Sequence, residues 1–396
     1  MKFAHLSDTH LGATNFKLKE REEDFLRAFD EAIEISIKEN VDFIIHSGDL
    51  FDKPNPSYHV LRFCMRKLRE VHRRKIPFII IPGSHDLGVE GSPINLLEEI
   101  GYVINLQNFL KEEGGKFKLG GIELPEKKVF ICGIPGIRSE IRKIYKNLEV
   151  QPRQGYYNIF AFHHTLAEIP EVGVYADIEA KLLPKGFDYY AAGHYHSRIQ
   201  LQIGNSMLNY PGSTEYCDLS EIEQDREKGF FIIEDNKPRW IKLSTRNFVV
   251  QPVNCNNLNP QQVVEVCRKM IKPSSGGILI LKLMGRLSKG NRNEIDREAI
   301  ENFAKENGYL FVKIYLSELL NPDSIAVLEI KKKSLEEIEE EYLRRQKYDD
   351  GAIKLAKLLI SHLGKELKPS EVSEICSKLY KILMEGIKVE DKESSA

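Results

Sequence analysis

The sequence contains few cysteines, and none of them stand in a paired motif. Its six cysteines lie far apart with no C-x-x-C pair, which argues against a zinc ribbon and against a disulfide scaffold. Its longest apolar run, around "GILILKLM", falls far short of the ~20 residues that a membrane helix needs. The N-terminus shows no secretion signal, because Asp8 and His10 occupy the region where an apolar core would have to lie. We therefore expect a cytoplasmic protein with free thiols and no membrane segment.

The chain also lacks a large excess of charge of either sign, and it has no low-complexity tract. Its formal net charge is −2 over 396 residues. This balance excludes a general electrostatic attraction to nucleic acid or anionic lipid, so any such surface must be local. A composition of 42% hydrophobic and 29% charged residues is typical of a folded globular protein. The length predicts two or three domains.

Up to about residue 246, short β-rich runs alternate with helical patterns. Six runs predict strands, and most end in Gly, Asp or His: "KFAHLSD", "VDFIIHSGD", "PFIIIPG", "KVFICGIPG", "NIFAFHHT" and "DYYAAGHYH". Phe25, Phe29 and Ile33 predict an amphipathic helix between the first two strands. A second helix is predicted by an apolar stripe of Leu61, Cys64, Met65, Leu68 and Val71. This repetition predicts parallel pairing in an α/β sandwich core, with ligands beyond the carboxyl ends of the strands.

The character of the chain changes after this first part. The predicted order is an α/β core in 1–246, a small α/β domain in 247–320, a linker in 321–334, a helical segment in 335–390 and a tail in 391–396. Ser334 and Glu337 form a capping box that predicts the start of the helical segment. A helical segment of this size is marginal alone. We expect it to pack on another part of this protein or on a partner.

Five short segments at strand ends carry the residues with metal chemistry: "DTH", "GDLFD", "GSHD", "FHHT" and "GHYH". Taken singly, a D-x-H or H-x-H pattern is more often an ordinary polar pair. Together they indicate a metal centre, because residues two apart share one side of a strand and the glycines allow sharp turns. A set of histidines and carboxylates suits Mn, Fe or Zn. One shared carboxylate would place two ions about 3.5–4 Å apart.

In this order the segments resemble the calcineurin-like metallophosphoesterase superfamily, with its D-x-H, G-D-x-x-D, G-N-H-D/E, H and G-H-x-H motifs. More narrowly, "HLSDTHLG" and "YPGSTEYCDLSEIEQDREKGFFIIE" are similar to the Mre11 family of double-strand-break repair nucleases, called SbcD in bacteria. The resemblance implies an α/β fold: a metallophosphoesterase β-sandwich flanked by helices, a small α/β capping domain and a C-terminal helical segment that binds a partner.

The resemblance also implies two Mn²⁺ ions per subunit. The implied metal ligands are Asp8, His10, Asp49 and His196 for one ion, and Asp49, Ser84, His163 and His194 for the other. Hydroxide held by the two ions would attack a phosphodiester, and His85 would protonate the leaving group. Asp86 would orient His85, although a turn cap is an equally good interpretation.

Two positions depart from the family pattern. Ser84 stands where relatives carry Asn, which predicts a weak second metal site. Asp52 stands where many relatives carry His, and an acid there repels phosphate unless it is paired. His164, next to a predicted ligand, is expected to be structural.

A basic segment from Lys53 to Lys75 holds eight basic residues against one acid. Such a run is usually a solvated helix face, but phosphate contacts of this kind also position DNA. The predicted DNA-binding residues are Lys53, Arg62, Arg66, Arg69 and Arg73. The resemblance further implies a homodimer and a coiled-coil ATPase of the Rad50 (SbcC) type, and the predicted partner-binding residues are Ile338, Tyr342, Ile353, Leu358, Ile375 and Leu379.

The sequence thus favours a Mn²⁺-dependent DNA nuclease that acts on DNA ends without sequence preference in break repair. By resemblance, its activities would be single-strand endonuclease and double-strand 3′–5′ exonuclease. Two alternatives stay open. The same ligands serve a general phosphomonoesterase or phosphodiesterase, and the departures at Ser84 and Asp52 allow a scaffold with weak or no catalysis.

Overall fold

The computed structural model describes residues 1–322, except Glu90, Arg138 and Asp225, together with six single residues further on. These are Ala352, Ile353, Leu355, Ala356, Leu359 and Leu379. Most of the predicted linker and most of the predicted helical segment therefore lie outside the described residues. So do four of the predicted partner-binding residues: Ile338, Tyr342, Leu358 and Ile375.

The chain divides into two compact units. The first comprises Met1–Val253, Glu265–Lys282 and Arg297–Tyr315, and the second comprises Asn254–Val264, Leu283–Asp296 and the segment that begins at Leu316. Within the described ranges, no helix offers an apolar stretch that would reach across a lipid bilayer.

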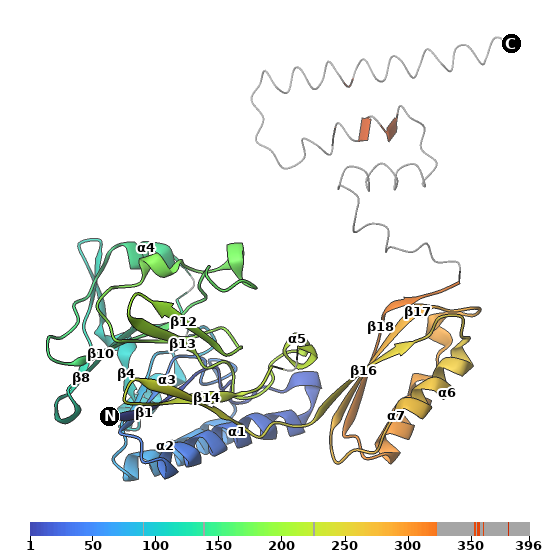
Figure 1. Ribbon diagram of the computed structural model, residues 1–396, viewed down its shortest axis with the longest axis horizontal. Coiled ribbons are helices and arrows are strands. Elements are labelled where there is room, and N and C mark those ends of the chain that lie inside the picture. The colour runs from blue at the N-terminus through green and yellow to red at the C-terminus, as the bar shows by residue number, and fades with distance from the viewer. Residues whose placement is uncertain are drawn as a thin grey trace. The chain divides into compact units, whose positions relative to one another are not determined.

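Two six-stranded mixed sheets form the centre of the first unit (Figure 1). The first sheet has the order β15 (Lys237–Lys242), β14 (Gly229–Glu234), β1 (Lys2–Leu6), β2 (Phe43–His46), β3 (Phe78–Ile80) and β4 (Ile104–Asn105). The second has the order β12 (Ile199–Ile203), β13 (Ser206–Tyr210), β11 (Tyr189–Gly193), β10 (Tyr157–His163), β8 (Val129–Ile134) and β7 (Ile122–Leu124). The strands of β1 to β4 pair in parallel, as do β8, β10, β11 and β13. All six strands predicted from the sequence are present.

The two sheets pack face to face as a sandwich. One buried cluster joins Phe3, Phe43 and Ile45 of the first sheet to Ile131 and Ile159 of the second. Neighbouring residues on the same strands point the other way, because side chains alternate along a strand. Ala4 and Ile44, for example, belong to a separate cluster formed with the helices that cover the first sheet.

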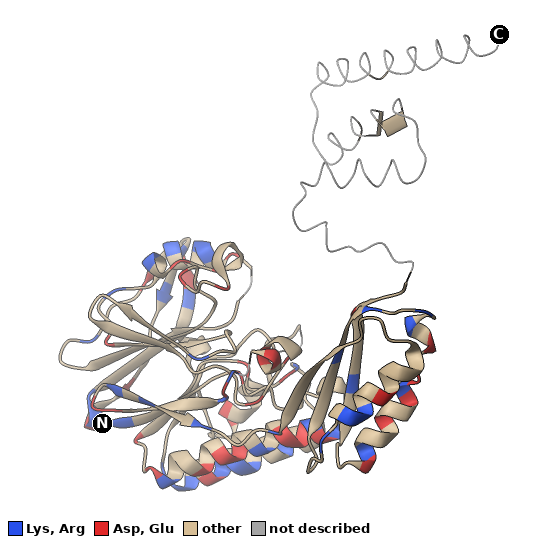
Figure 2. Ribbon diagram, turned by 45° about the vertical axis from the view of Figure 1, so that its right-hand side comes forward, with Lys and Arg blue, Asp and Glu red and all other residues tan. Residues whose placement is uncertain are grey.

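The helices that cover the first sheet are α1 (Lys19–Lys38), α2 (Tyr58–Arg73) and α3 (Pro93–Glu99). The predicted stripe of α1 is confirmed, since Phe25, Phe29 and Ile33 are buried. Ser57 caps α2, because its hydroxyl accepts a hydrogen bond from Val60 N. The shorter helices α4 (Ile141–Lys146) and α5 (Leu219–Glu223) follow later in the chain, and α4 packs against the outer face of the second sheet. Acidic and basic side chains share the same helices (Figure 2), in accord with the small net charge.

Two three-stranded sheets complete the described structure. One contains β5 (Leu110–Glu113), β6 (Lys116–Leu119) and β9 (Leu148–Glu149). The other contains β16 (Phe248–Asn254), β17 (Ile278–Arg286) and β18 (Phe311–Leu320), with helices α6 (Pro260–Met270) and α7 (Arg297–Glu306) between its strands in sequence. Residues 247–320, predicted to be a small α/β domain, thus contain these three strands and two helices.

Candidate metal centre

The predicted metal ligands lie at the carboxyl ends of parallel strands, with His163 as the last residue of β10 and the others on the loops that follow. Asp8 and His10 follow β1, Asp49 follows β2, and His194 follows β11. All four have left-handed backbones, with φ of 51°, 42°, 55° and 83°, which non-glycine residues seldom adopt. Left-handed residues of this kind cluster at functional sites, where the surrounding fold holds them in place.

Two glycines allow these loops to approach one another. A Cβ on Gly83 would lie 2.2 Å from Asp49 N, and a Cβ on Gly193 would lie 2.1 Å from Ser47 O. No side chain fits at either position, because real Cβ contacts are longer than this. Gly83 of "GSHD" is therefore required where the loops after β2 and β3 of the first sheet touch, and Gly193 of "GHYH" where the end of β11 meets the loop after β2 of the other sheet.

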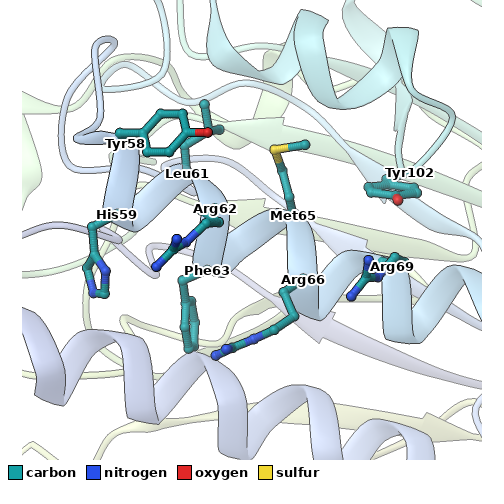
Figure 3. Close-up of a pocket in the computed structure, with 9 residues that line it drawn as sticks. All are labelled: Tyr58, His59, Leu61, Arg62, Phe63, Met65, Arg66, Arg69 and Tyr102. Carbon is teal, nitrogen blue, oxygen red and sulfur yellow. The ribbon is translucent and has the colours of Figure 1, made fainter.

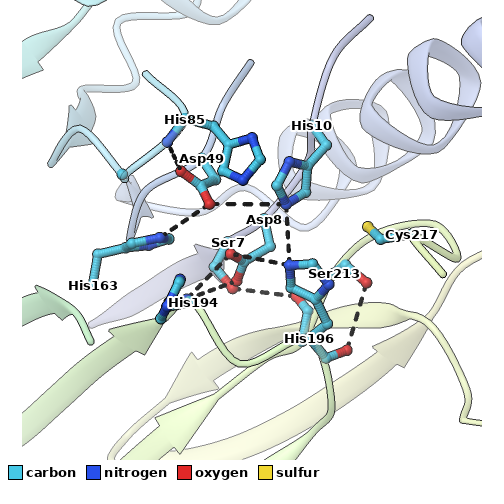
Figure 4. Close-up of polar contacts among 12 residues, drawn as sticks. Ser7, Asp8, His10, Asp49, His85, His163, His194, His196, Ser213 and Cys217 are labelled. Carbon is cyan, nitrogen blue, oxygen red and sulfur yellow. Dashed lines mark hydrogen bonds and ion pairs between the residues drawn. The ribbon is translucent and has the colours of Figure 1, made fainter. Parts of the chain in front are cut away.

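The loops bring six of the predicted ligands together (Figure 4). Asp8, His10 and Asp49 form one group of potential ligand atoms, and Asp49 with His163 and His194 forms another. Asp49 belongs to both groups, and its Oδ2 lies 3.1 Å from His163 Nε2 and 3.9 Å from His10 Nε2.

His196 joins the first group. Its Nε2 lies 3.1 Å from His10 Nε2 and 3.9 Å from Asp8 Oδ1. Imidazole nitrogens and carboxylate oxygens are both ligands for divalent transition-metal cations. The donor set gathered here, Asp8, His10, Asp49 and His196, therefore fits a metal centre.

Burial and neighbouring charges both shift the pKa values of the predicted ligands. Burial alone would raise the pKa of Asp49, but His163 and His10 hold that pKa below its ordinary value. Burial would lower the pKa of His163, but Asp49 raises it to about 9. Burial and the neighbouring His163 lower the pKa of His194 to about 4. Without a cation, the centre thus holds an Asp49–His163 ion pair beside the neutral imidazoles of His10 and His194.

Comparison with known proteins places the chain in a family. Residues 1–198 match the model of the calcineurin-like phosphoesterases. The DNA double-strand break repair protein Mre11 of Saccharolobus solfataricus is 31% identical over 403 residues, which cover 96% of this chain and 98% of that protein. The Mre11 protein of Methanococcus maripaludis is 29% identical over 366 residues, covering 88% and 92%. The chain belongs to the Mre11 family of calcineurin-like phosphoesterases. It is thus a member of a metallophosphoesterase nuclease family.

Behind the ligands of this Mre11-family centre, oxygen atoms hold the outward nitrogens of the imidazoles. His163 Nδ1 lies 2.8 Å from Ser47 O, and His196 Nδ1 lies 2.8 Å from Glu221 Oε1. The other carboxylate oxygen of Glu221 lies 2.6 Å from Lys228 Nζ. Such contacts fix the ring and its tautomer, so that the inward nitrogen presents its lone pair. Sequence reasoning missed Glu221 and Lys228, although both lie in the "YPGSTEYCDLSEIEQDREKG" stretch that carried the family resemblance.

His85 lies at the edge of the same centre. Its main-chain N donates a 2.7 Å hydrogen bond to Asp49 Oδ1, and its Nδ1 donates to the main-chain carbonyl of Asp52 at 2.8 Å. The rings of His85 and His10 are 4.9 Å apart. The Asp52 carbonyl, rather than Asp86, therefore orients the His85 ring.

Asp86 caps the turn instead. Its carboxylate accepts hydrogen bonds from the main-chain N–H groups of Leu50, Phe51 and Gly83. It thereby ties the loop that carries Asp49 to the loop of "GSHD". Burial, with Asp49 nearby, raises the pKa of Asp86 to about 7. Of the two interpretations made from the sequence, the turn cap agrees with these contacts.

The structure also shows the surroundings of Asp52, Ser84 and His164. Asp52 Oδ1 lies 3.9 Å from His10 Nδ1, and burial raises the pKa of the Asp52 carboxyl. Ser84 is partly exposed on the loop between Gly83 and His85. His164 is buried, and its nitrogens contact the Tyr145 hydroxyl and the Ile137 carbonyl, in accord with a structural role.

The predicted DNA-binding residues lie apart from the ligand groups, on α2 and the loop before it. Lys53, Arg62, Arg66, Arg69 and Arg73 are all exposed.

The stripe predicted for α2 divides in two, because Cys64, Leu68 and Val71 are buried in the core whereas Leu61 and Met65 are only partly buried. The basic residue Lys67 is also buried, where it pairs with Asp30, Glu34 and Glu70, so it adds nothing to a DNA-binding surface.

Proposed function

We propose that the chain is a Mn²⁺-dependent nuclease that cleaves DNA in double-strand-break repair. The observation that carries the proposal is the pair of ligand groups that share Asp49, in a chain that matches Mre11 repair proteins over almost its whole length. By family resemblance its activities are a single-strand endonuclease and a double-strand 3′–5′ exonuclease, and it works with a Rad50-type ATPase through its C-terminal segment.

In this proposal one ion is held by Asp8, His10, Asp49 and His196, and the second by Asp49, Ser84, His163 and His194. Two such cations lower the pKa of a water molecule and offset the negative charge of the phosphate. The protein's own contribution is to hold the ligands in place and to move a proton.

The proton donor is His85. In its charged form the ring carries a proton on each nitrogen, and the Asp52 carbonyl 2.8 Å away engages Nδ1–H. The proton on Nε2 is then the one that can pass to the leaving oxygen of the cleaved strand. After transfer, the neutral ring keeps Nδ1–H in the same hydrogen bond, so the ring orientation does not change.

The proposal is tested by comparing two substrates in Mn²⁺. We expect cleavage of a plasmid and of end-labelled oligonucleotides, with poor turnover of p-nitrophenyl phosphate. Good turnover of the monoester with intact DNA would instead identify a general phosphomonoesterase. Tight DNA binding without cleavage of either substrate would identify a scaffold.

We expect Ser84→Asn to strengthen the second metal site. An amide carbonyl reaches further than a serine hydroxyl and is a better oxygen ligand for a hard cation. The cleavage rate at limiting Mn²⁺ should rise about tenfold, as is typical when one group around a metal changes. The measurement is a Mn²⁺ titration followed by both calorimetry and cleavage. If the rate stays the same in Ser84→Asn while His85→Ala abolishes cleavage, Ser84 does not limit the second site.

The α2 surface supports a homodimer better than a DNA contact. Its hollow of about 490 Å³ is lined by apolar and aromatic residues as well as arginines (Figure 3). The lining includes Tyr58, Leu61, Met65 and Tyr102, and Tyr58 is 80% exposed. Exposed apolar patches flanked by Arg are typical of protein interfaces. A second copy of the chain is the proposed occupant, as the family resemblance implies.

Light scattering tests this surface with Tyr58→Glu. We expect the mass to fall from that of two chains to that of one, because the variant loses the exposed aromatic ring and must desolvate a carboxylate in the interface. Lys53→Glu, outside the hollow, serves as the control: it should keep the dimer and weaken DNA binding. A dimer that survives Tyr58→Glu would place the interface elsewhere.

A further inference from the structure

A cysteine lies at the edge of the metal centre. Cys217 Sγ and the ring nitrogens of His10 and His196 lie within 4.8 Å of one another, and Figure 4 shows the thiol beside the His196 ring. The sequence had suggested a centre without cysteine. Among the five cysteines that the structure describes, the other four are buried in the interior, whereas Cys217 is partly exposed. An ion that enters the centre can therefore reach this thiol.

Hydrogen bonds of its main-chain N and O hold Cys217 beside His196. Cys217 N donates a 2.9 Å hydrogen bond to Glu221 Oε2, and the other oxygen of the same carboxylate lies 2.8 Å from His196 Nδ1. From the opposite side, Asn15 Nδ2 donates to Cys217 O at 2.6 Å. One carboxylate thus positions both the imidazole and the cysteine. The thiol makes a weak 3.5 Å contact with Glu215 O and also interacts with the His196 ring, so it already faces a ligand of the centre.

Two imidazoles and one thiolate are a different kind of ligand set from the carboxylate-rich set assigned to Mn²⁺. Zinc binds Cys at about 2.3 Å and His at about 2.0–2.1 Å in tetrahedral sites. Around such an ion, the ligand atoms lie about 3.3–3.7 Å apart, by simple tetrahedral geometry from these bond lengths. The present separations, 3.1 Å between the two imidazole nitrogens and no more than 4.8 Å to the thiol, are close to this range. Manganese, by contrast, favours oxygen ligands over thiolate.

We propose that His10, His196 and Cys217 form a site for a thiophilic divalent cation, of which Zn²⁺ is the physiological candidate, within the metal centre. The inference rests on the proposed function of this centre. When the metal–sulfur bond forms, the thiol proton is released to solvent. Asp8 supplies the fourth ligand, since its Oδ1 lies 3.9 Å from His196 Nε2.

The site makes zinc an antagonist of the nuclease. Four protein ligands close the coordination shell of a zinc ion, as in structural zinc sites, and leave no open position for water or substrate. Such an ion uses His10 and His196, so it excludes Mn²⁺ from the first position. Zinc added before Mn²⁺ should therefore suppress cleavage, and a chelator should restore it.

The test compares the full chain with Cys217→Ser and with Cys255→Ser, which makes the same change at a buried cysteine of the other unit. Cobalt(II) replaces zinc as the spectroscopic probe, because a cobalt–thiolate bond gives a charge-transfer band in the near ultraviolet. We expect this band in the wild type and in Cys255→Ser, and its loss in Cys217→Ser. In competition with a chelator, the zinc affinity of Cys217→Ser should fall at least about tenfold, whereas the Mn²⁺ affinity should change less than about threefold, because only zinc uses the thiolate.

Three results would overturn the inference: no thiolate band in the wild type, the same band in Cys217→Ser, or equal losses of zinc and Mn²⁺ affinity in that variant. Equal losses would mean that Cys217 only supports the loop. Retained Mn²⁺ binding with no thiolate band rejects the zinc site and leaves the proposed nuclease intact. Failure of the wild type to bind Mn²⁺ at all rejects the nuclease centre itself.

Discussion

Asp49→Asn should abolish Mn²⁺-dependent DNA cleavage, with a loss of about 10³-fold or more. Asp49 is the residue that the two ligand groups share, so its charge serves both cations. Electrostatic stabilisation by bound cations amounts to several kcal/mol, and each 1.4 kcal/mol corresponds to tenfold in rate. Calorimetry should show that the variant no longer binds two Mn²⁺ ions, because the amide keeps the shape of the side chain and removes its charge.

The matched control is Asp235→Asn, at a side chain that is 81% exposed. This change removes one carboxylate from the surface and should leave both metal binding and cleavage as they are. Two Mn²⁺ ions bound with wild-type affinity in Asp49→Asn would show that the two groups of ligands do not form one centre.

His85→Ala should lower DNA cleavage by about 10²–10⁴-fold, the range typical of a lost general acid, while Mn²⁺ affinity stays close to the wild-type value. The hydrogen bond that holds Asp49 comes from the main-chain N of residue 85, and this group survives the substitution. Cleavage assays and Mn²⁺ calorimetry on the same preparation separate the two effects.

A substrate whose leaving group needs no protonation tests whether His85 is the proton donor. Bis(p-nitrophenyl) phosphate releases nitrophenolate, which needs no protonation, so its hydrolysis should change far less in His85→Ala than the cleavage of DNA. His72→Ala, at an exposed histidine of α2, is the control for loss of an imidazole. An equal loss on both substrates would assign His85 a role in substrate or metal binding instead.

The sequence predicted the parts of the molecule that repeat a local pattern. The six strands follow from apolar runs that end at Gly, Asp or His, and α1 follows from the spacing of Phe25, Phe29 and Ile33. The six ligands that the structure brings together follow from motifs at those strand ends. Short edge strands such as β4, with two residues, carry too little pattern to be recognised.

The residues that sequence reasoning missed depend on contacts between distant segments. Glu221 lies in α5, 25 residues from His196 along the chain, and Cys217 lies just before that helix. No spacing rule encodes their approach to the centre. For the same reason, the sequence suggested that Lys67 belongs to a basic face, whereas in the structure it pairs with Asp30 and Glu34 of α1. A charge run shows how many charges are present and leaves their partners unspecified.

The left-handed backbones of Asp8, His10, Asp49 and His194 have a consequence for how cations exchange. Each such residue costs on the order of 1 kcal/mol, which the two packed sheets must supply whether or not an ion is bound. The packed sheets, and not a bound ion, therefore fix the positions of these ligand residues. Mn²⁺ and Zn²⁺ would then compete for one preformed site. The ligand preference and the concentration of each cation would decide which one binds, without refolding of the loops.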